Sequence, residues 1–272
     1  MSARPALLGI LNITEDSFSD GGRYLASDAA LAHARALAAD GADILDLGAA
    51  SSNPDAKPVA PNLELERLAP VVEVLKAEGI RISVDSFSPR VQQWAISQGV
   101  EFINDIAGFP HEGLYPELAA SGAKLIVMHA VQGGPSSQRV TVPADEILDR
   151  IIRFFDGRLA ALEKAGIARD RLIIDPGMGF FVGTIPEASY AVLRGIQTLK
   201  SIFGLPLLVS VSRKSFLRVL TGRKPCEAGA ASLAAELFAA RMGADFIRTH
   251  DPAALKDALA VTAVLDGKPP EA

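Results

Sequence analysis

Only one of the 272 residues is a cysteine, Cys226, so the chain can form neither an internal disulfide nor a metal site built from cysteines. No apolar run approaches the roughly 20 residues that a membrane-spanning helix needs. The 32 Asp and Glu residues outnumber the 27 Lys and Arg, and the net charge of −5 provides no overall positive field to attract nucleic acid or anionic lipid. The opening stretch, MSARPALLGILNIT, contains no signal-peptide cleavage pattern. We therefore expect a cytoplasmic protein whose partners are small molecules, with no nucleic acid and no membrane among them.

Motifs for several common kinds of catalysis are absent as well. The four histidines lack the spacing of a zinc site, there is no G-x-S-x-G nucleophile motif, and Cys226 has no evident histidine partner. P-loop and dinucleotide-binding fingerprints are also missing. The site must therefore act mainly by binding and positioning its substrates. Because the chain has no overall positive field, any anionic substrate must be bound by basic side chains within the site itself.

Eight short apolar runs recur along the chain, each ending in a polar residue or a glycine. They are continuous rather than alternating, which is typical of strands buried on both faces of a parallel sheet. Helical stretches lie between them, so we predict an α/β fold, a single (β/α)8 TIM barrel spanning residues 1–272. An open doubly wound sheet is the alternative. The eight runs are ALLGILN, DILDLG, RISVDS, FINDI, LIVMH, LIIDPG, LPLLVSVS and FIRTH.

The helical stretches have recognisable start and stop signals. We expect Ser27 or Asp28 to be the N-cap of the first helix and Gly41 to follow its end. Ser88 and Pro89 are typical of the cap and first position of another helix. The remaining helices are expected within residues 61–79, 111–122, 143–166, 186–204, 230–243 and 252–267.

Polar side chains stand at the end of every predicted strand. In a parallel barrel all the carboxyl ends open at one mouth, where TIM barrels place their active sites. Any one of these residues could be an ordinary cap or turn former, because Asp and Asn are common in turns. Eight strand ends together favour a binding site. The residues are Asn12, Asp46, Asp85, Asn104 with Asp105, His129, Asp175, Ser212 with Arg213 and Lys214, and Arg248 with His250.

These strand-end residues divide into two halves of different chemistry. Asp85, Asn104 and Asp175 supply acceptors and an amide that suit the edge of a heterocycle carrying adjacent N–H and NH2 donors. The stretches VSVSRKSF and FIRTH bring basic side chains to strands seven and eight, where barrels often bind phosphate. Asn12, on the neighbouring first strand, could offer an oxygen to a Mg²⁺ that bridges phosphate oxygens. We expect a site that holds a heterocycle and clamps its phosphate while another molecule displaces that phosphate.

Taken in order, these motifs resemble those of the dihydropteroate synthase family. The matching segments are GILNITEDSFSDGGRY, DILDLG, SVDS, FINDI, VMH, IIDPGMGF, SRKSF and IRTHDP, from the first strand to the last. The resemblance implies a TIM barrel that condenses 6-hydroxymethyl-7,8-dihydropterin diphosphate with p-aminobenzoate in folate biosynthesis and releases diphosphate with help from Mg²⁺. It also implies a homodimer.

The resemblance assigns roles to individual residues. The catalytic residues would be Lys214, Asp85 and Arg248. The pterin would be held by Asp85, Asn104, Asp175 and Lys214, with Met128 and Phe180 beside it. The diphosphate would face Asn12, which would also ligate the metal, and Ser52, Arg248 and His250. The p-aminobenzoate pocket would be formed by Phe180, Phe181, Gly183, Ser212 and Lys214.

Two loops depart from the family's pattern. AASSNP stands where the family has Gly-Glu-Ser-Thr-Arg-Pro, so Asn53 replaces an arginine that binds phosphate. DPGMGFFVGT replaces DPGFGFGK, and this loop is apolar, two residues longer and without the lysine. A sulfonamide is bulkier than p-aminobenzoate at its sulfonyl end, so we expect the stretch from Phe181 to Gly183 to form a wall that excludes the drug. The sequence thus predicts a sulfonamide-insensitive synthase.

Two other functions fit part of the pattern. A pterin-binding barrel that transfers a methyl group from methyltetrahydrofolate to a corrinoid protein would share the heterocycle contacts, but it has no use for a diphosphate cluster. A non-catalytic pterin-binding homologue would account for the missing lysine and arginine. Release of diphosphate would distinguish the synthase from both.

Overall fold

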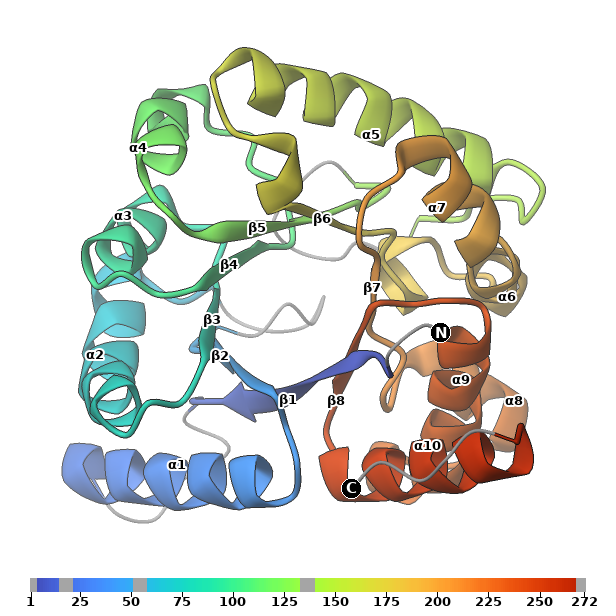
Figure 1. Ribbon diagram of the computed structural model, residues 1–272, viewed down its shortest axis with the longest axis horizontal. Helices are drawn as coiled ribbons and strands as arrows, with labels where there is room; N and C mark the ends of the chain where they lie inside the picture. The colour runs from blue at the N-terminus through green and yellow to red at the C-terminus, as the bar shows by residue number, and fades with distance from the viewer. Residues whose placement is uncertain (1–3, 15–21, 51–57, 133–139, 268–272) are drawn as a thin grey trace.

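The computed structural model contains one parallel sheet with the strand order β6-β5-β4-β3-β2-β1-β8-β7 (Figure 1). It describes residues 4–14, 22–50, 58–132 and 140–267. A parallel bridge between Ile174 and Leu207 joins β6 to the segment entering β7 and brings the sheet to near closure. The predicted (β/α)8 barrel is confirmed, and the open sheet was the wrong alternative. The strands are β1 Ala6–Asn12, β2 Ile44–Gly48, β3 Ile82–Asp85, β4 Phe102–Asp105, β5 Lys124–Met128, β6 Leu172–Asp175, β7 Leu208–Val209 and β8 Phe246–Thr249.

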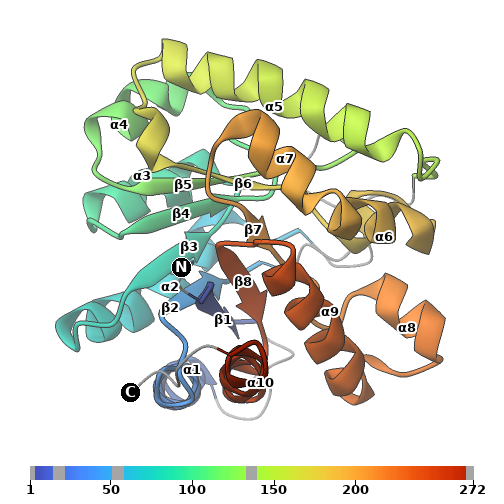
Figure 2. The same cartoon turned by 45° about the vertical axis from the view of Figure 1, so that its right-hand side comes forward.

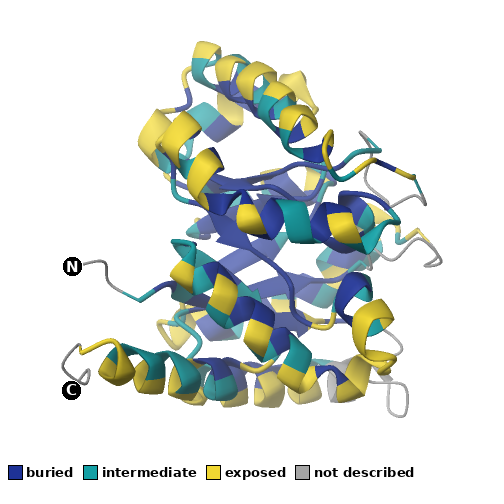
Figure 3. Cartoon of the chain, turned by 90° about the vertical axis from the view of Figure 1, so that its right-hand side faces the viewer, coloured by how far each residue is buried: buried dark blue, intermediate teal, exposed yellow. Residues whose placement is uncertain are grey.

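Helices surround the barrel (Figure 2). Buried and exposed positions alternate along the helices (Figure 3). They are α1 Gly22–Ala39, α2 Pro61–Ala77, α3 Pro89–Ser97, α4 Tyr115–Ala120, α5 Ile147–Lys164, α6 Pro186–Arg194, α7 Ile196–Phe203, α8 Ser215–Thr221, α9 Gly229–Arg241 and α10 Pro252–Leu265. None of the helices in the described ranges is long and apolar enough to cross a membrane. That residues 1–272 form one domain stays a prediction, because both chain ends lie outside the described residues.

Three helix predictions need correction. Ser27 and Asp28 lie inside α1 rather than at its start, because no glycine or proline between Arg23 and Asp28 stops the helix from extending upstream. The helix expected over 186–204 is divided at Gly195, where a Cβ would lie 2.6 Å from the Leu148 side chain of α5. The short helix α8 was not predicted. Ser88 is the N-cap of α3 as expected, although its side chain makes no capping hydrogen bond.

The barrel interior is filled below the mouth by one layer of apolar side chains. This floor consists of Leu8, Ile44, Phe102, Ile126, Ile173 and Leu208, with Phe246 packed against them. Successive side chains of a strand alternate between its two faces, so the residue two positions further along also points into the barrel. On β2, β4, β6 and β8 that step leads from the floor to Asp46, Asn104, Asp175 and Arg248. The polar strand ends therefore sit directly above a sealed apolar floor.

Candidate active site

Arg248 joins the carboxylates of two other strands across the barrel mouth. Its Nε donates to Asp46 Oδ2 at 2.5 Å, and its Nη2 donates to Asp85 Oδ2 at 2.9 Å. Asn104 Nδ2 approaches the same Asp46 oxygen at 3.4 Å. Asp46 Oδ1 and Asn104 Oδ1 are buried and have no hydrogen-bond partner among the described residues. Buried acceptors without a partner cost free energy, so these two oxygens are suited to accept hydrogen bonds from a ligand.

Two carboxyl groups of the mouth have pKa values raised toward neutrality. Burial, reinforced by the neighbouring charge of Asp46, raises the pKa of Asp85 to about 7, although Arg248 acts against it. Burial also raises the pKa of Asp175 to about 6, against the lowering effects of the Gly177 N–H and the Lys214 ammonium. Both groups therefore titrate close to physiological pH, as residues of functional sites often do.

The turn after β6 fixes the orientation of Asp175. Gly177 N donates to Asp175 Oδ1 at 2.8 Å, and Gly177 has a φ of 75°, which favours glycine. A Cβ on Gly177 would lie 2.4 Å from the carbonyl oxygen of His129, so a larger residue cannot fit. His129 Nδ1 contacts Pro176 O at 3.1 Å, and burial lowers the pKa of this histidine to about 4. His129 is thus a neutral, buried support for the turn.

Lys214 lies beside an apolar cluster and forms no ion pair with the described residues. Its Nζ is 5.1 Å from the centroid of the Phe181 ring, a cation–π distance. Phe181 packs with Ile106, Met128 and Ala130, with Phe87 at the edge of the cluster. Burial, with Arg248 nearby, lowers the pKa of Lys214 to about 8, although Asp175 and Asp85 oppose that shift. The mouth therefore has one apolar wall with an ammonium group above it.

The loop after β6 is attached to the loop after β5 on both sides of the undescribed residues 133–139. Before them, Val131 N donates to Phe181 O at 2.9 Å and Gln132 Nε2 donates to Phe180 O at 3.1 Å. After them, Thr184 N donates to Val140 O at 2.9 Å. Phe181 and Val182 are 5% and 0% exposed. The longer loop is consequently packed into the molecule, so its side chains have fixed positions.

The ends of β7 and β8 meet through Ser212 and His250. Ser212 Oγ lies 3.2 Å from His250 N and 3.0 Å from His250 Nδ1. Burial, together with the charges of Arg213, Arg248 and Lys214, lowers the pKa of His250 to about 3. Arg213 is exposed and has a φ of 59°, and its N–H donates to Ser232 Oγ at 2.9 Å. The two strand ends therefore form one hydrogen-bonded unit with a neutral imidazole.

Asn12 lies at the mouth close to Asp85. A Cβ on Gly48 would be 3.9 Å from Asn12 Oδ1 and 3.8 Å from Asp85 Oδ2, so Gly48 keeps space open between the two oxygens. Asn12 itself is exposed. Within the described ranges, no group of three or more His, Cys, Asp or Glu residues could hold a metal ion by itself. Asn12 is thus an accessible oxygen in a place that has room for a ligand.

The structure brings most of the predicted site residues to this mouth. Phe180 is different, because it is partly exposed and lies outside the cluster in which Phe181 packs with Met128. Ser52 and Asn53 lie outside the described residues. Asp105 is a structural residue, since its carboxylate accepts hydrogen bonds from Ala107 N, Phe109 N and Gln92 Nε2. Alternation along β4 already indicates this, because Asn104 and Asp105 must point to opposite faces.

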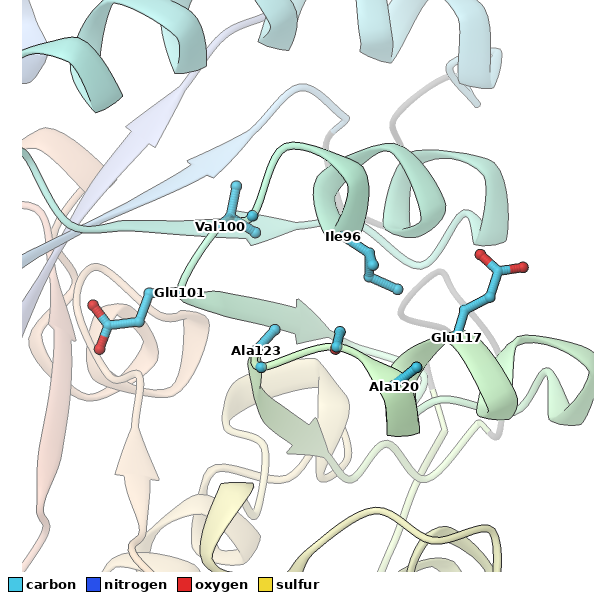
Figure 4. A pocket seen from close by; sticks show the side chains of 9 residues that line it. Ile96, Val100, Glu101, Glu117, Ala120 and Ala123 are labelled. Atoms are coloured by element: carbon cyan, nitrogen blue, oxygen red, sulfur yellow. The ribbon is translucent and has the colours of Figure 1, made fainter.

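A pocket lies at the other end of the barrel, away from these residues. It has a volume of about 620 Å³ and is lined by the end of α3, the end of α4 and the residues that lead into β4 and β5, including Glu101, Glu117 and Ala123 (Figure 4). Glu101 forms an ion pair with Arg81 there. The amino-terminal face of a TIM barrel contributes to stability rather than to catalysis, so this pocket gives no reason to move the candidate site.

Comparison with known proteins agrees with the geometry. The model of a family described as pterin binding enzyme matches residues 8–250. The chain is 60% identical over 259 residues to dihydropteroate synthase type-2 of Escherichia coli, with 95% of each covered. The solved structure of Xanthomonas albilineans dihydropteroate synthase with 4-aminobenzoic acid has a TM-score of 0.88 and 38% identity, with 98% of this chain and 94% of that chain covered. A Yersinia pestis dihydropteroate synthase with a sulfonamide drug has a TM-score of 0.88 and 35% identity, covering 97% and 95%.

Proposed function

The chain belongs to the dihydropteroate synthase family, transferases of folate biosynthesis, and from this premise we propose how its own residues carry out the reaction. The reaction joins 6-hydroxymethyl-7,8-dihydropterin diphosphate to p-aminobenzoate and releases diphosphate. The observation that carries the proposal is the convergence of acceptors and cations on one mouth, in which Arg248 contacts both Asp46 and Asp85.

Asp85, Asn104, Asp175 and Lys214 hold the pterin. Asp175 is oriented by Gly177 N through Oδ1, and its Oδ2 makes no hydrogen bond within the described part of the chain. A carboxylate fixed in this way can accept hydrogen bonds from adjacent ring N–H and NH2 groups. Asn104 Oδ1, which has no hydrogen-bond partner among the described residues, offers a further acceptor. Met128 and Phe181 provide the apolar surface for the ring.

The diphosphate faces the ends of β8 and β1. Arg248 and His250 lie at the end of β8, and Asn12 ends β1, which pairs with β8. Positive charge that is held in place before the reaction stabilises the negative charge that develops on a departing diphosphate. We accordingly assign Arg248 and Lys214 to catalysis, together with Asp85, which accepts a hydrogen bond from Arg248 and helps to hold it in place. Ser52 belongs to the same predicted set but lies outside the described residues.

Asn12 is the one protein ligand that we assign to Mg²⁺. Magnesium commonly keeps several waters and takes only one or two protein oxygens together with substrate phosphates. An exposed amide oxygen beside the space that Gly48 leaves open fits that pattern. When bound, the ion would neutralise charge on the diphosphate oxygens.

The p-aminobenzoate pocket is the site of drug discrimination. It consists of Phe180, Phe181, Gly183, Ser212 and Lys214. The ring of Phe181 is placed beneath Lys214 and is 5% exposed, so it cannot easily move aside for a bulkier ligand. Gly183 has a φ of 128° and packs closely against Val142, because a Cβ on Gly183 would lie only 3.3 Å from the Val142 Cβ. We assign to Phe181 the role of excluding sulfonamides. Its ring would clash with the sulfonyl group of the drug, whereas the smaller carboxylate of p-aminobenzoate would fit.

We also propose that the chain forms a homodimer. Apart from Ile202, the large apolar side chains that are exposed in the described part of the chain are on α8, α9 and α10. Val219 and Leu220 on α8 are each 69% exposed, and Phe238 on α9 is 40% exposed. Figure 2 shows α8 projecting from the side of the barrel next to α9. Exposed apolar side chains that gather on neighbouring helices are typical of a subunit interface.

Steady-state assays test the function directly. The purified enzyme is given pterin diphosphate, p-aminobenzoate and Mg²⁺, and both dihydropteroate and diphosphate are measured, with and without sulfamethoxazole. We expect turnover that persists at drug concentrations that block a synthase of the sensitive type. Inhibition equal to that of the sensitive enzyme would refute drug exclusion. Pterin binding without diphosphate release would favour the non-catalytic homologue.

A further inference from the structure

A single peptide group connects His129 to the carboxylate of Asp175. This group, the turn peptide, joins Pro176 to Gly177 in the turn after β6. Its carbonyl oxygen lies 3.1 Å from His129 Nδ1, and its N–H donates to Asp175 Oδ1 at 2.8 Å. The C=O and N–H bonds of a trans peptide lie in one plane and point in opposite directions. A contact that fixes the oxygen therefore also fixes the N–H, so the orientation of Asp175 depends on His129.

The backbone of His129 contacts the same turn. β5 pairs with β6 up to Met128 and Asp175, and the next residue continues the contact, because His129 N donates to Asp175 O at 2.8 Å. The carbonyl oxygen of His129 lies so close to Gly177 that a Cβ there would be only 2.4 Å away. The turn thus rests on the main chain of His129 as well as on its ring, and the ring contact is the part that a substitution can remove.

The contact with Pro176 O defines the protonation of the His129 ring. A carbonyl oxygen can only accept, so Nδ1 must carry a hydrogen. Burial lowers the pKa of His129 to about 4, so the ring is neutral at physiological pH and its one N–H hydrogen is on Nδ1. His129 is 3% exposed, and its ring packs edge-on against Phe154 of α5, with 5.3 Å between the centroids. The ring therefore presents a single donor in a fixed place.

We propose that His129 is a positioning residue for pterin binding, which acts through the turn peptide to hold Asp175 in the orientation that accepts the ring donors. The inference deepens the proposed function, since it relies on Asp175 as a pterin contact. Donation to a carbonyl oxygen polarises its peptide and makes the N–H of the same peptide a stronger donor. That N–H acts to lower the pKa of Asp175 against the effect of burial, so loss of the His129 donor should raise the pKa of Asp175.

Two substitutions separate the donor from the packing of the ring. His129→Asn keeps a donor, because the amide nitrogen of asparagine is bonded to Cγ as Nδ1 is in histidine, but it loses most of the contact with Phe154. His129→Leu keeps a larger apolar side chain and has no donor. Calorimetric titration with 6-hydroxymethylpterin should give a dissociation constant within about threefold of the wild type for His129→Asn and at least roughly tenfold higher for His129→Leu. Equal constants, or the opposite order, are what packing alone predicts and would overturn the inference.

Nitrogen-15 NMR of the ligand-free protein tests the donor without any binding measurement. The histidines are labelled, and the signal that His129→Asn lacks belongs to His129. We expect a neutral ring with Nδ1–H at pH 7. An Nε2–H tautomer or a charged ring would overturn the inference, and this wild-type result does not depend on the stability of a variant. His111→Leu, at an exposed position before α4, is the control for the binding measurement and should leave the pterin affinity unchanged.

The pH dependence of kcat/KM gives a readout that a merely structural residue would not move. The acid limb that reports Asp175 should shift upward by at least about half a pH unit in His129→Leu and should stay in place in His129→Asn. The charged groups that face Asp175 are Lys214, Arg248 and Asp46, and all three remain in both variants. An unshifted limb in His129→Leu would overturn the inference. Unchanged pterin affinity in Asp175→Asn would instead count against the proposed pterin contact itself, so the two failures are distinguishable.

Discussion

The guanidinium of Arg248 on β8 donates a 2.9 Å hydrogen bond to Asp85 on β3, across the mouth of the barrel. Its Nε also reaches Asp46 on β2, so one side chain connects three strands. From the sequence, we predicted that Arg248 belongs to a basic, phosphate-binding half of the site and Asp85 to a half that supplies hydrogen-bond acceptors. The structure joins those halves, so a diphosphate bound as we propose would compete with Asp46 and Asp85 for the guanidinium of Arg248.

Replacing Arg248 with methionine should destabilise the protein. Asp46 is 0% exposed, and removing one partner of a buried ion pair typically costs about 3–5 kcal/mol of the free energy of unfolding. Urea unfolding at pH 8 measures that loss. Arg241→Met, at an exposed position on α9, is the control and should change the free energy of unfolding by less than about 0.5 kcal/mol.

The loss in Arg248→Met should be smaller at pH 6. Burial already raises the pKa of Asp85 to about 7, and removing Arg248 raises it further. Between pH 4 and that value the native carboxyl binds a proton that the unfolded chain has released, so lowering the pH stabilises the native state relative to the unfolded state. An equal or greater loss at pH 6 would contradict the pairing.

Asp175→Asn should weaken pterin binding by roughly tenfold to a hundredfold, because an amide offers only one acceptor oxygen where the carboxylate offers two and hydrogen bonds to charged groups are strong. Calorimetric titration with 6-hydroxymethylpterin measures the dissociation constant. Asp170→Asn, at an exposed position just before β6, removes the same charge outside the site and should have no effect. Equal affinity in the two variants would remove Asp175 from the pterin contacts.

The pH dependence of kcat/KM should be bell-shaped. Burial raises the pKa of Asp175 to about 6, and the group must be ionised to accept the pterin donors, so activity falls below that pH. Burial lowers the pKa of Lys214 to about 8, and the ammonium is lost above it. Lys214→Arg should move the alkaline limb upward, because arginine stays charged. If the alkaline limb does not move in this variant, it reports the titration of a group other than Lys214.

The sequence predicted the barrel and its mouth because both follow from local patterns. Continuous apolar runs are typical of buried parallel strands, and their polar ends had to meet once the sheet closed. The floor formed by Leu8 and Ile44 follows from alternation along the same strands. The extent of α1 and the break at Gly195 were not predictable in this way, because they depend on what packs against each segment.

The finer details of the site depend on tertiary contacts. Phe180 and Phe181 are adjacent in the sequence, and only the short turn Gly179–Phe181 determines which ring enters the cluster with Met128.

Phe181→Ala should make the enzyme sensitive to sulfonamides. Removing the ring opens space beneath Lys214, so the inhibition constant of sulfamethoxazole should fall by at least about tenfold, while the KM for p-aminobenzoate changes less. Phe180→Ala, which alters the neighbouring ring of the same pocket, should lower the inhibition constant less, because that ring lies outside the cluster with Met128. The opposite order of the two variants would assign the wall to Phe180.

Leu220→Asp should convert the proposed dimer to a monomer. Leu220 is 69% exposed on α8, and in a subunit interface its carboxylate replacement would be buried without a partner, at a cost of several kcal/mol. Light scattering after size-exclusion chromatography should give twice the chain mass of 28.6 kDa for the wild type and 28.6 kDa for the variant. Ala160→Asp adds the same charge at an exposed position of α5, on the far side of the barrel from α8, and should remain dimeric (Figure 1). A monomeric wild type at micromolar concentration, or a variant that stays dimeric, would show that this apolar surface is not the interface.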